Sequence, residues 1–96
     1  MKILILGGDG YLGWPTSMHL ANEGHEVYSI DNLSKRKIAS EHGVEPLNII
    51  KPFNERVKIW NKNQKNKIKH MISDLLNYKV LCEILKEFKP ETIIHY

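Results

Sequence analysis

Short continuous apolar runs alternate along the chain with apolar residues at helical spacing. Residues 3–6 form one such run, followed by Gly7 and Gly8, which is the pattern of a strand buried on both faces of a parallel sheet. Between residues 11 and 23 the apolar positions recur at roughly helical spacing, and Gly24 supplies the stop. A second strand is expected over residues 26–30. The beginning of the chain therefore predicts a strand, a glycine turn, a helix and a strand.

The connection that follows, residues 33–66, is long and is expected to contain two helical pieces. One lies near residues 35–42, and the other begins after Pro52, where Phe53, Val57 and Trp60 share one helix face. The pattern then predicts a strand at 68–72, a helix at 78–88 that ends before Pro90, and the start of a further strand at 92–96. This alternation predicts an α/β fold with a doubly wound parallel sheet and right-handed crossovers, in the strand order 3-2-1-4.

Composition bounds what such a chain can be. It has 96 residues and one cysteine, Cys82, so a disulfide framework is excluded, and no Cys/His cluster has the spacing of zinc ligands. A chain of this length can bury only a little over half of the surface that its unfolded form exposes, and neither a disulfide nor a metal is available to compensate. The apolar run near the start is too short for a membrane span or a signal segment, which makes a cytoplasmic location the expectation. We expect the 96 residues to be one part of a larger domain.

Basic residues gather between positions 51 and 70, where Glu55 is the single acidic residue. The cluster consists of Lys51, Arg56, Lys58, Lys62, Lys65, Lys67 and Lys69. Such a cluster can bind phosphate backbones, but Phe53 and Trp60 are the two aromatic rings of Phe, Trp or Tyr type within it, too few for a series of stacking side chains. A solvated basic face is the favoured interpretation, and neither a nucleic acid nor a membrane is expected as a partner.

Three glycines of the turn have the spacing that dinucleotide binding requires. Gly7, Gly10 and Gly13 come directly after the first predicted strand and directly before the first helix. Gly7 allows the tight turn, Gly10 lets a pyrophosphate approach the backbone, and Gly13 lets the helix pack closely. Asp9, also in the turn, suits unusual backbone dihedral angles and receives no chemical role. The helix N-terminus would then hold the phosphates of the dinucleotide.

Two acidic residues at strand ends complete this candidate site. Asp31 follows Gly13 by 18 residues and can accept hydrogen bonds from ribose hydroxyls, while its charge disfavours a 2′-phosphate, so NAD is predicted over NADP. The basic residues at 35–37 could contact a 2′-phosphate and count against that preference. Asp74 is expected beside the adenine, or alternatively as the N-cap of the helix at 78–88. No residue of the chain is assigned as a metal ligand.

The segments GGDGYLG, DNL and IIHY together resemble the extended short-chain dehydrogenase/reductase superfamily, the NAD-dependent epimerases and dehydratases of nucleotide sugars. Within it, the segments GGDGYLGW, DNLSKR, ERVKIW and SDL are most similar to the UDP-sulfoquinovose synthases. Asp74 follows Asp31 by 43 residues, and this spacing also favours that group, because simpler sugar epimerases have a shorter connection there. The resemblance covers essentially the whole chain and implies the N-terminal part, residues 1–96, of an NAD-binding Rossmann domain.

The resemblance also implies roles for particular residues. The cofactor NAD would contact Tyr11 and Leu12 in the turn. It would also contact Asp31, Asn32 and Arg36 at and after the end of the second strand, and Asp74 and Leu75 at the end of the third strand. The implied reaction joins UDP-glucose and sulfite through a transient NAD-dependent oxidation at glucose C4. Arg56 and Trp60 could line the sugar side, although packing is the favoured role of Trp60.

Where that reaction takes place is a separate expectation. The superfamily's Thr, Tyr and Lys catalytic set and its sugar-nucleotide domain would lie beyond Tyr96, so the chain alone is expected to be inactive. The full-length enzyme is expected to form homo-oligomers. Two alternatives stay open, namely another epimerase or dehydratase of nucleotide sugars and a standalone NAD-binding module that needs a partner chain.

Overall fold

The computed structural model describes residues 1–33, 43, 51–73 and 77–96, and in them strands and helices alternate as expected. The elements are β1 (Lys2–Leu6), α1 (Gly13–Asn22), β2 (Glu26–Asp31), α3 (Phe53–Asn63), β3 (Ile68–Ile72), α4 (Tyr78–Phe88) and β4 (Thr92–His95). The predicted helix near residues 35–42 lies outside the described residues. None of the described helices has the length and apolar character needed to cross a membrane.

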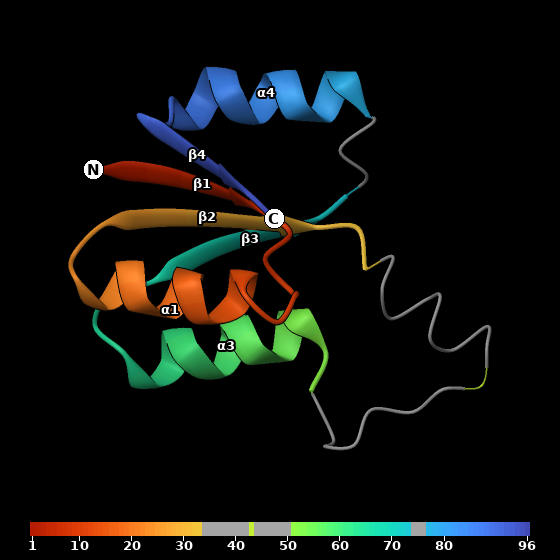
Figure 1. Ribbon diagram of the computed structural model, residues 1–96. Coiled ribbons are helices and arrows are strands. Elements are labelled where there is room, and N and C mark those ends of the chain that lie inside the picture. The colour runs from red at the N-terminus through yellow and green to blue at the C-terminus, as the bar shows by residue number, and fades with distance from the viewer. Residues whose placement is uncertain (34–42, 44–50, 74–76) are drawn as a thin grey trace.

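The four strands form one parallel sheet in the order β3-β2-β1-β4, which confirms the predicted topology (Figure 1). β1 lies in the interior of the sheet, with Leu4 opposite Tyr28 of β2 on one side and Ile93 of β4 on the other. The carboxyl ends of all four strands therefore meet at the same edge. In α/β sheets of this kind, that edge is where ligands bind.

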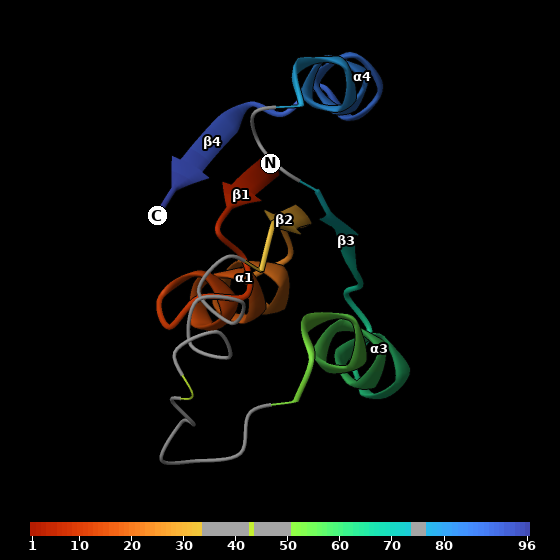
Figure 2. The same ribbon diagram turned by 90° about the vertical axis from the view of Figure 1, so that its right-hand side faces the viewer.

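Helices cover both faces of the sheet. Figures 1 and 2 show α1 and α3 on one face and α4 on the other. The first face is closed by Ile3, Ile5, Val27 and Ile68 of the strands with Trp14, Ala21, Phe53 and Val57 of the helices, and the second by Leu4, Ile30, Ile84 and Phe88. Since side chains of a strand alternate between faces, burial on both sides explains the unbroken apolar run of β1.

The helix after Pro52 packs as its pattern predicted. Phe53 and Val57 are fully buried against the sheet, and Trp60 is partly buried beside them. The Phe53 ring meets the rings of Trp14 and His70 edge to face, with centroids 6.1 and 5.6 Å apart. Such geometry is favourable between aromatic quadrupoles. Phe53 thus links α3 to both α1 and β3.

One helix start and one N-cap residue differ from the sequence expectation. α1 begins at Gly13 rather than at residue 11, because residues 10–12 belong to the turn, and Leu12 is 57% exposed instead of facing the core. At α4 the N-cap is Asn77, whose side chain accepts a hydrogen bond from the Val80 amide at 3.3 Å. The alternative role of Asp74 as that N-cap is therefore wrong.

Candidate functional site

The glycine turn joins the carboxyl end of β1 to the start of α1, and its geometry disfavours a side chain at Gly7 and at Gly13 for different reasons. Gly7 has a φ of +94°, which favours glycine. A Cβ at Gly13 would lie 1.9 Å from the carbonyl oxygen of Gly7. The first turn of α1 therefore packs directly on the backbone of the preceding loop.

Gly10 has the opposite surroundings. Among the described residues, a Cβ there would meet one atom within 4 Å, the Gly7 carbonyl oxygen at 3.3 Å. The backbone at Gly10 is therefore open on its outer side, as close approach of a phosphate group requires. The predicted distinction between glycines that shape the turn and one that leaves it accessible matches this geometry.

Gly8 is a further requirement that the spacing rule did not identify. A Cβ at Gly8 would lie 1.7 Å from Oγ of Ser29 in β2 and 3.2 Å from the ring of Phe53. Ser29 is itself fixed by a buried hydrogen bond with Ser17 of α1, at 3.1 Å. The Gly7-Gly8 pair was the available signal, but its cause is a contact between segments distant in sequence.

The N-terminus of α1 is open to an anion. The N-cap residue Leu12 makes no side-chain capping bond, and the first turn of this fully described helix contains no acidic residue. The first amides of a helix lack intrahelical acceptors and carry the positive end of the helix dipole. Tyr11, two residues before the helix, is 90% exposed. The site thus fits the pyrophosphate of a dinucleotide.

Asp31, at the carboxyl end of β2, connects to the glycine turn through its side chain. Its Oδ2 accepts a hydrogen bond from the Asp9 amide at 3.0 Å, and its Oδ1 accepts one from the Leu33 amide at 2.6 Å. Both carboxylate oxygens are thereby oriented, and each keeps a further lone pair for a hydroxyl donor. Asp31 is well suited to accept hydrogen bonds from a ribose placed beside the turn.

Arg56 reaches the same turn from α3. Its Nη2 donates to the Asp9 carbonyl oxygen at 2.8 Å and pairs with the Asp9 carboxylate. The guanidinium also lies over the indole of Trp14, 5.2 Å from the ring centroid. The positive-φ residues other than glycine in the described chain are Leu33 and Lys89, so Asp9 has no unusual backbone angle. The described contacts of Arg56 are therefore with the glycine turn and α1.

The remaining predicted site residues divide into two groups. Asn32 follows directly on Asp31 and lies beside the site, whereas Arg36, Asp74 and Leu75 fall outside the described residues. The carboxyl end of β4 also adjoins the turn, since the Tyr96 hydroxyl lies 2.8 Å from Thr16 Oγ1 and its carbonyl oxygen adjoins Gly7. The described part of the site is thus assembled from β1, α1, β2, α3 and the end of β4.

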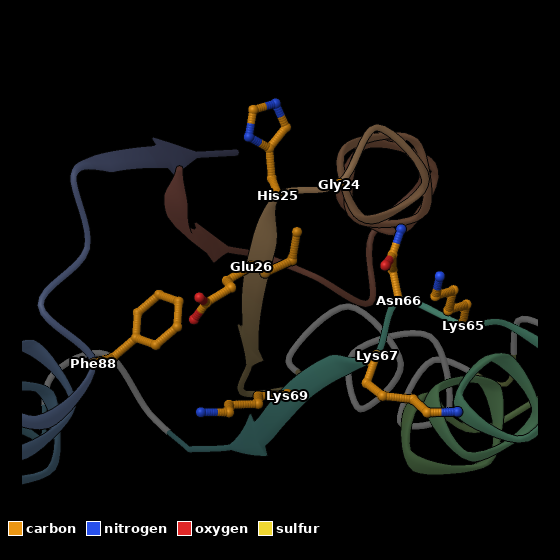
Figure 3. A pocket seen from close by; sticks show the side chains of 9 residues that line it. Gly24, His25, Glu26, Lys65, Asn66, Lys67, Lys69 and Phe88 are labelled. Carbon is orange, nitrogen blue, oxygen red and sulfur yellow. The ribbon is translucent and has the colours of Figure 1, made fainter.

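A cavity of 280 Å³ lies at the other end of the sheet (Figure 3). It is bordered by His25 and Glu26 at the start of β2 and by Lys67 and Lys69 around the start of β3. Because these positions precede or open their strands, the strands themselves separate this cavity from the glycine turn. Figure 3 shows the side chains of Lys67 and Lys69 pointing in different directions, so they do not converge on a common point.

A parallel sheet in the order 3-2-1-4, with a glycine turn leading into an uncapped helix and an acid at the end of the second strand, defines a Rossmann-type dinucleotide-binding domain. A family model agrees with this class. The NAD dependent epimerase/dehydratase family matches residues 3–96, and the chain belongs to that family. Its cofactor is NAD.

Among known proteins, the chain is similar to UDP-sulfoquinovose synthases and to UDP-glucose 4-epimerases. It is 40% identical over its whole length to the UDP-sulfoquinovose synthase of Sulfolobus acidocaldarius and 30% identical over 99% of its length to the chloroplastic one of Spinacia oleracea. The UDP-glucose 4-epimerase of Bacillus subtilis is 31% identical over the whole chain. The chain spans 24%, 20% and 24% of these relatives, respectively.

Solved structures show the same fold. The UDP-glucose 4-epimerase of Stenotrophomonas maltophila, solved with bound NAD, aligns with a TM-score of 0.71 at 19% identity, covering 100% of this chain and 24% of its own. The UDP-Glc/GlcNAc 4-epimerase of Campylobacter jejuni aligns with a TM-score of 0.66 at 28% identity, covering 99% and 23%. These alignments confirm the predicted Rossmann-type sheet.

Proposed function

We propose that residues 1–96 form the N-terminal, NAD-binding portion of a nucleotide-sugar-modifying enzyme, and that this enzyme is a UDP-sulfoquinovose synthase. The observation that carries the proposal is the 40% identity over the whole chain to the Sulfolobus acidocaldarius synthase, compared with 33% to the Klebsiella pneumoniae epimerase and 31% to the Bacillus subtilis one. The enzyme would act on UDP-glucose and sulfite. Another NAD-dependent epimerase of nucleotide sugars is the second candidate, since such enzymes also match the entire chain.

Each described part of the site has a task in this proposal. The backbone at Gly10 and the amides of Tyr11 and Leu12 would hold the pyrophosphate at the positive end of α1. Asp31 would accept hydrogen bonds from the adenosine ribose, with its orientation fixed by the amides of Asp9 and Leu33. When bound, NAD would supply the hydride acceptor for oxidation of a sugar carbon. The chain's own residues bind and orient it.

The adenine end of the site is proposed from the sequence. Asn32 would assist Asp31 at the ribose, Arg36 would lie near the adenosine, and Asp74 with Leu75 would border the adenine. The acid and base for the sugar chemistry would belong to residues beyond position 96. We therefore propose that the 96-residue chain binds NAD without turnover and that activity belongs to the full gene product, as a homo-oligomer.

The test is product analysis with the full gene product. Purified enzyme is incubated with UDP-glucose, with and without sulfite, and the nucleotide sugars are separated and identified by mass spectrometry. Formation of UDP-sulfoquinovose only in the samples that contain sulfite supports the synthase. A C4 epimer of UDP-glucose that forms equally well without sulfite overturns the synthase and supports the second candidate. NAD binding with no conversion of UDP-glucose, whether sulfite is present or not, would indicate a binding module.

A further inference from the structure

Arg56 and Asp9 form an ion pair inside the pyrophosphate-binding turn. The two residues are 47 positions apart, and the side chains are 17% and 6% exposed, respectively. Arg56 donates both to the backbone carbonyl of Asp9 and to its carboxylate, while its guanidinium stacks over Trp14 of α1. These contacts hold the turn from two sides, since the Asp9 amide is bound to Asp31. The conformation of residue 9 therefore depends on α3.

Charge gives this contact a second consequence. A carboxylate in a turn that receives a pyrophosphate repels the ligand, and the repulsion is larger where water is excluded. Asp9 is almost fully buried, so solvent screens its charge poorly. Arg56 places a permanent positive charge against it, because a guanidinium stays protonated at any ordinary pH. The pair presents the ligand with a charge-balanced turn in place of an anionic one.

A further observation concerns the cost of the arrangement. Nε of Arg56 is buried and has no hydrogen-bond partner among the described residues. A buried donor without an acceptor destabilises the fold. An aliphatic residue in contact with Trp14 would avoid that cost. The position of Arg56 is therefore better explained by what it does for the turn than by its contribution to stability.

We propose that Arg56 is a positioning residue for the cofactor: through Asp9 it fixes the glycine turn and offsets the negative charge that would repel the pyrophosphate. The inference rests on the proposed function to the extent that this turn binds NAD. It assigns α3, which belongs to the connection between β2 and β3, a part in cofactor affinity. It also assigns a role to Asp9, which the glycine spacing left without one.

The experiment compares Arg56 variants with and without Asp9→Asn in the full gene product, freed of bound nucleotide, with NAD affinity measured by isothermal titration calorimetry. Arg56→Gln removes the positive charge and is expected to weaken NAD binding about tenfold, equivalent to about 1.4 kcal/mol. Asp9→Asn in the same protein is expected to restore binding to within about threefold of the unaltered protein, because the turn is again balanced. Arg56→Lys, which keeps the charge, is expected to retain more affinity than Arg56→Gln.

Two controls separate this role from a purely structural one. Lys58→Gln removes an exposed cation from the same helix and should leave NAD affinity unchanged. Adenosine, which lacks the pyrophosphate, should bind the Arg56→Gln protein as well as it binds the unaltered one. Melting temperatures are measured for every variant. If Arg56→Gln does not fold, NAD affinity is compared instead between Arg56→Lys and the double variant. Each is measured against the unaltered protein.

The outcomes are distinguishable. NAD binding that is the same in all folded Arg56 variants overturns the inference and leaves the proposed function intact. Equal losses for NAD and adenosine, or a double variant no better than Arg56→Gln, overturn the charge-balancing role. An unaltered protein that does not bind NAD overturns both the proposed function and this inference.

Discussion

The glycines of the turn differ in what a side chain would meet at each position. A Cβ at Gly13 would overlap the Gly7 carbonyl oxygen, whereas one at Gly10 would touch that oxygen at 3.3 Å and meet no other atom of the described residues within 4 Å. Stability and ligand access are thus assigned to different residues of one short loop. Single substitutions can separate them.

We expect Gly13→Ala to lower the free energy of unfolding by about 2 kcal/mol or more, because backbone must move to admit the methyl group. Gly10→Ala should change it by less than about 1 kcal/mol while weakening NAD binding, since the methyl group would occupy the side a phosphate approaches. Denaturant unfolding and calorimetric titration measure the two effects. A Gly10→Ala protein that binds NAD normally would place the pyrophosphate elsewhere.

Asp31 is expected to set the preference between NAD and NADP. Asp31→Asn keeps the size of the side chain and removes its charge, so repulsion of a 2′-phosphate falls. We predict that the ratio of the dissociation constants for NADP and NAD decreases about tenfold. Glu26→Gln, at the opposite end of β2, is the matched control and should leave the ratio as it is. An unchanged ratio in Asp31→Asn would rule out this role.

At the scale of elements, α3 matters because it contacts both the core and the turn. Phe53 is fully buried, joins Trp14 and His70 edge to face, and lies against Gly8. Arg56, about one helical turn further along α3, reaches Asp9. A helix from the long connection is therefore built into the wall of the cofactor site.

Phe53→Ala is predicted to cost about 3–5 kcal/mol of folding free energy, the range for removing a fully buried aromatic ring. Ile59 in the same helix is 44% exposed, so Ile59→Ala should cost less than about 1 kcal/mol of folding free energy. Chemical denaturation of both variants gives the comparison. Similar midpoints for the two would mean that α3 contributes little to the core.

The packing of α4 on the sheet predicts a pH dependence. Burial, together with the negative charge of Glu87, raises the pKa of Tyr28 above its usual value of 10.0, and its ring meets Phe88 edge to face at 5.4 Å. Above about pH 10 the unfolded chain loses this phenolic proton first, so stability falls as the pH rises. Tyr28→Phe should make the fall in melting temperature above pH 10 less steep. Tyr11→Phe, at an exposed residue, is the control, and the same slope in both variants would contradict the prediction.

The elements could be predicted because their patterns are local. Apolar residues occupy the positions that a packed element buries. The structure confirms this for the apolar run of β1 and for the spacing of Phe53, Val57 and Trp60. The start of α1 was misplaced, since the apolar character of Leu12 suggested a helix where the chain makes a turn.

The candidate site was only partly predictable, for a related reason. Gly7, Gly10 and Asp31 follow from the motif and its spacing. The contact of Arg56 with Asp9 and the collision that a Cβ at Gly8 would make with Ser29 join segments far apart in the chain. No local pattern encodes such contacts, because they arise from how the helices are placed on the sheet.

For the molecule as a whole, the order of the strands in the sheet determines how well the amides of each strand are protected from hydrogen exchange. β1 and β2 each have neighbours on both sides, whereas β3 and β4 pair on one side in the described part of the chain. Residues 3–5 of β1 are almost completely buried, while Ile93 of β4 is 51% exposed. Amide exchange requires local opening, which is easier where packing and pairing are incomplete.

Hydrogen exchange followed by NMR on the 96-residue chain should therefore find the slowest amides in β1 and β2. The amides of β4 should exchange markedly faster, with those of β3 in between, since Ile68 still anchors that strand under α3. Slow exchange throughout β4, equal to that in β1, would show that this edge is covered in solution, for example by a second copy of the chain.

The stacking of Arg56 over Trp14 has an optical consequence. The chain contains two tryptophans, and Trp14 lies 7% exposed at the start of α1, next to the glycine turn. Indole emission responds to nearby charge, so the fluorescence of Trp14 reports directly on the state of the turn. With Trp60 replaced by phenylalanine, the 96-residue chain would hold a single tryptophan, which lies beside the site, and selective excitation of that indole could follow filling of the site in real time without any added dye.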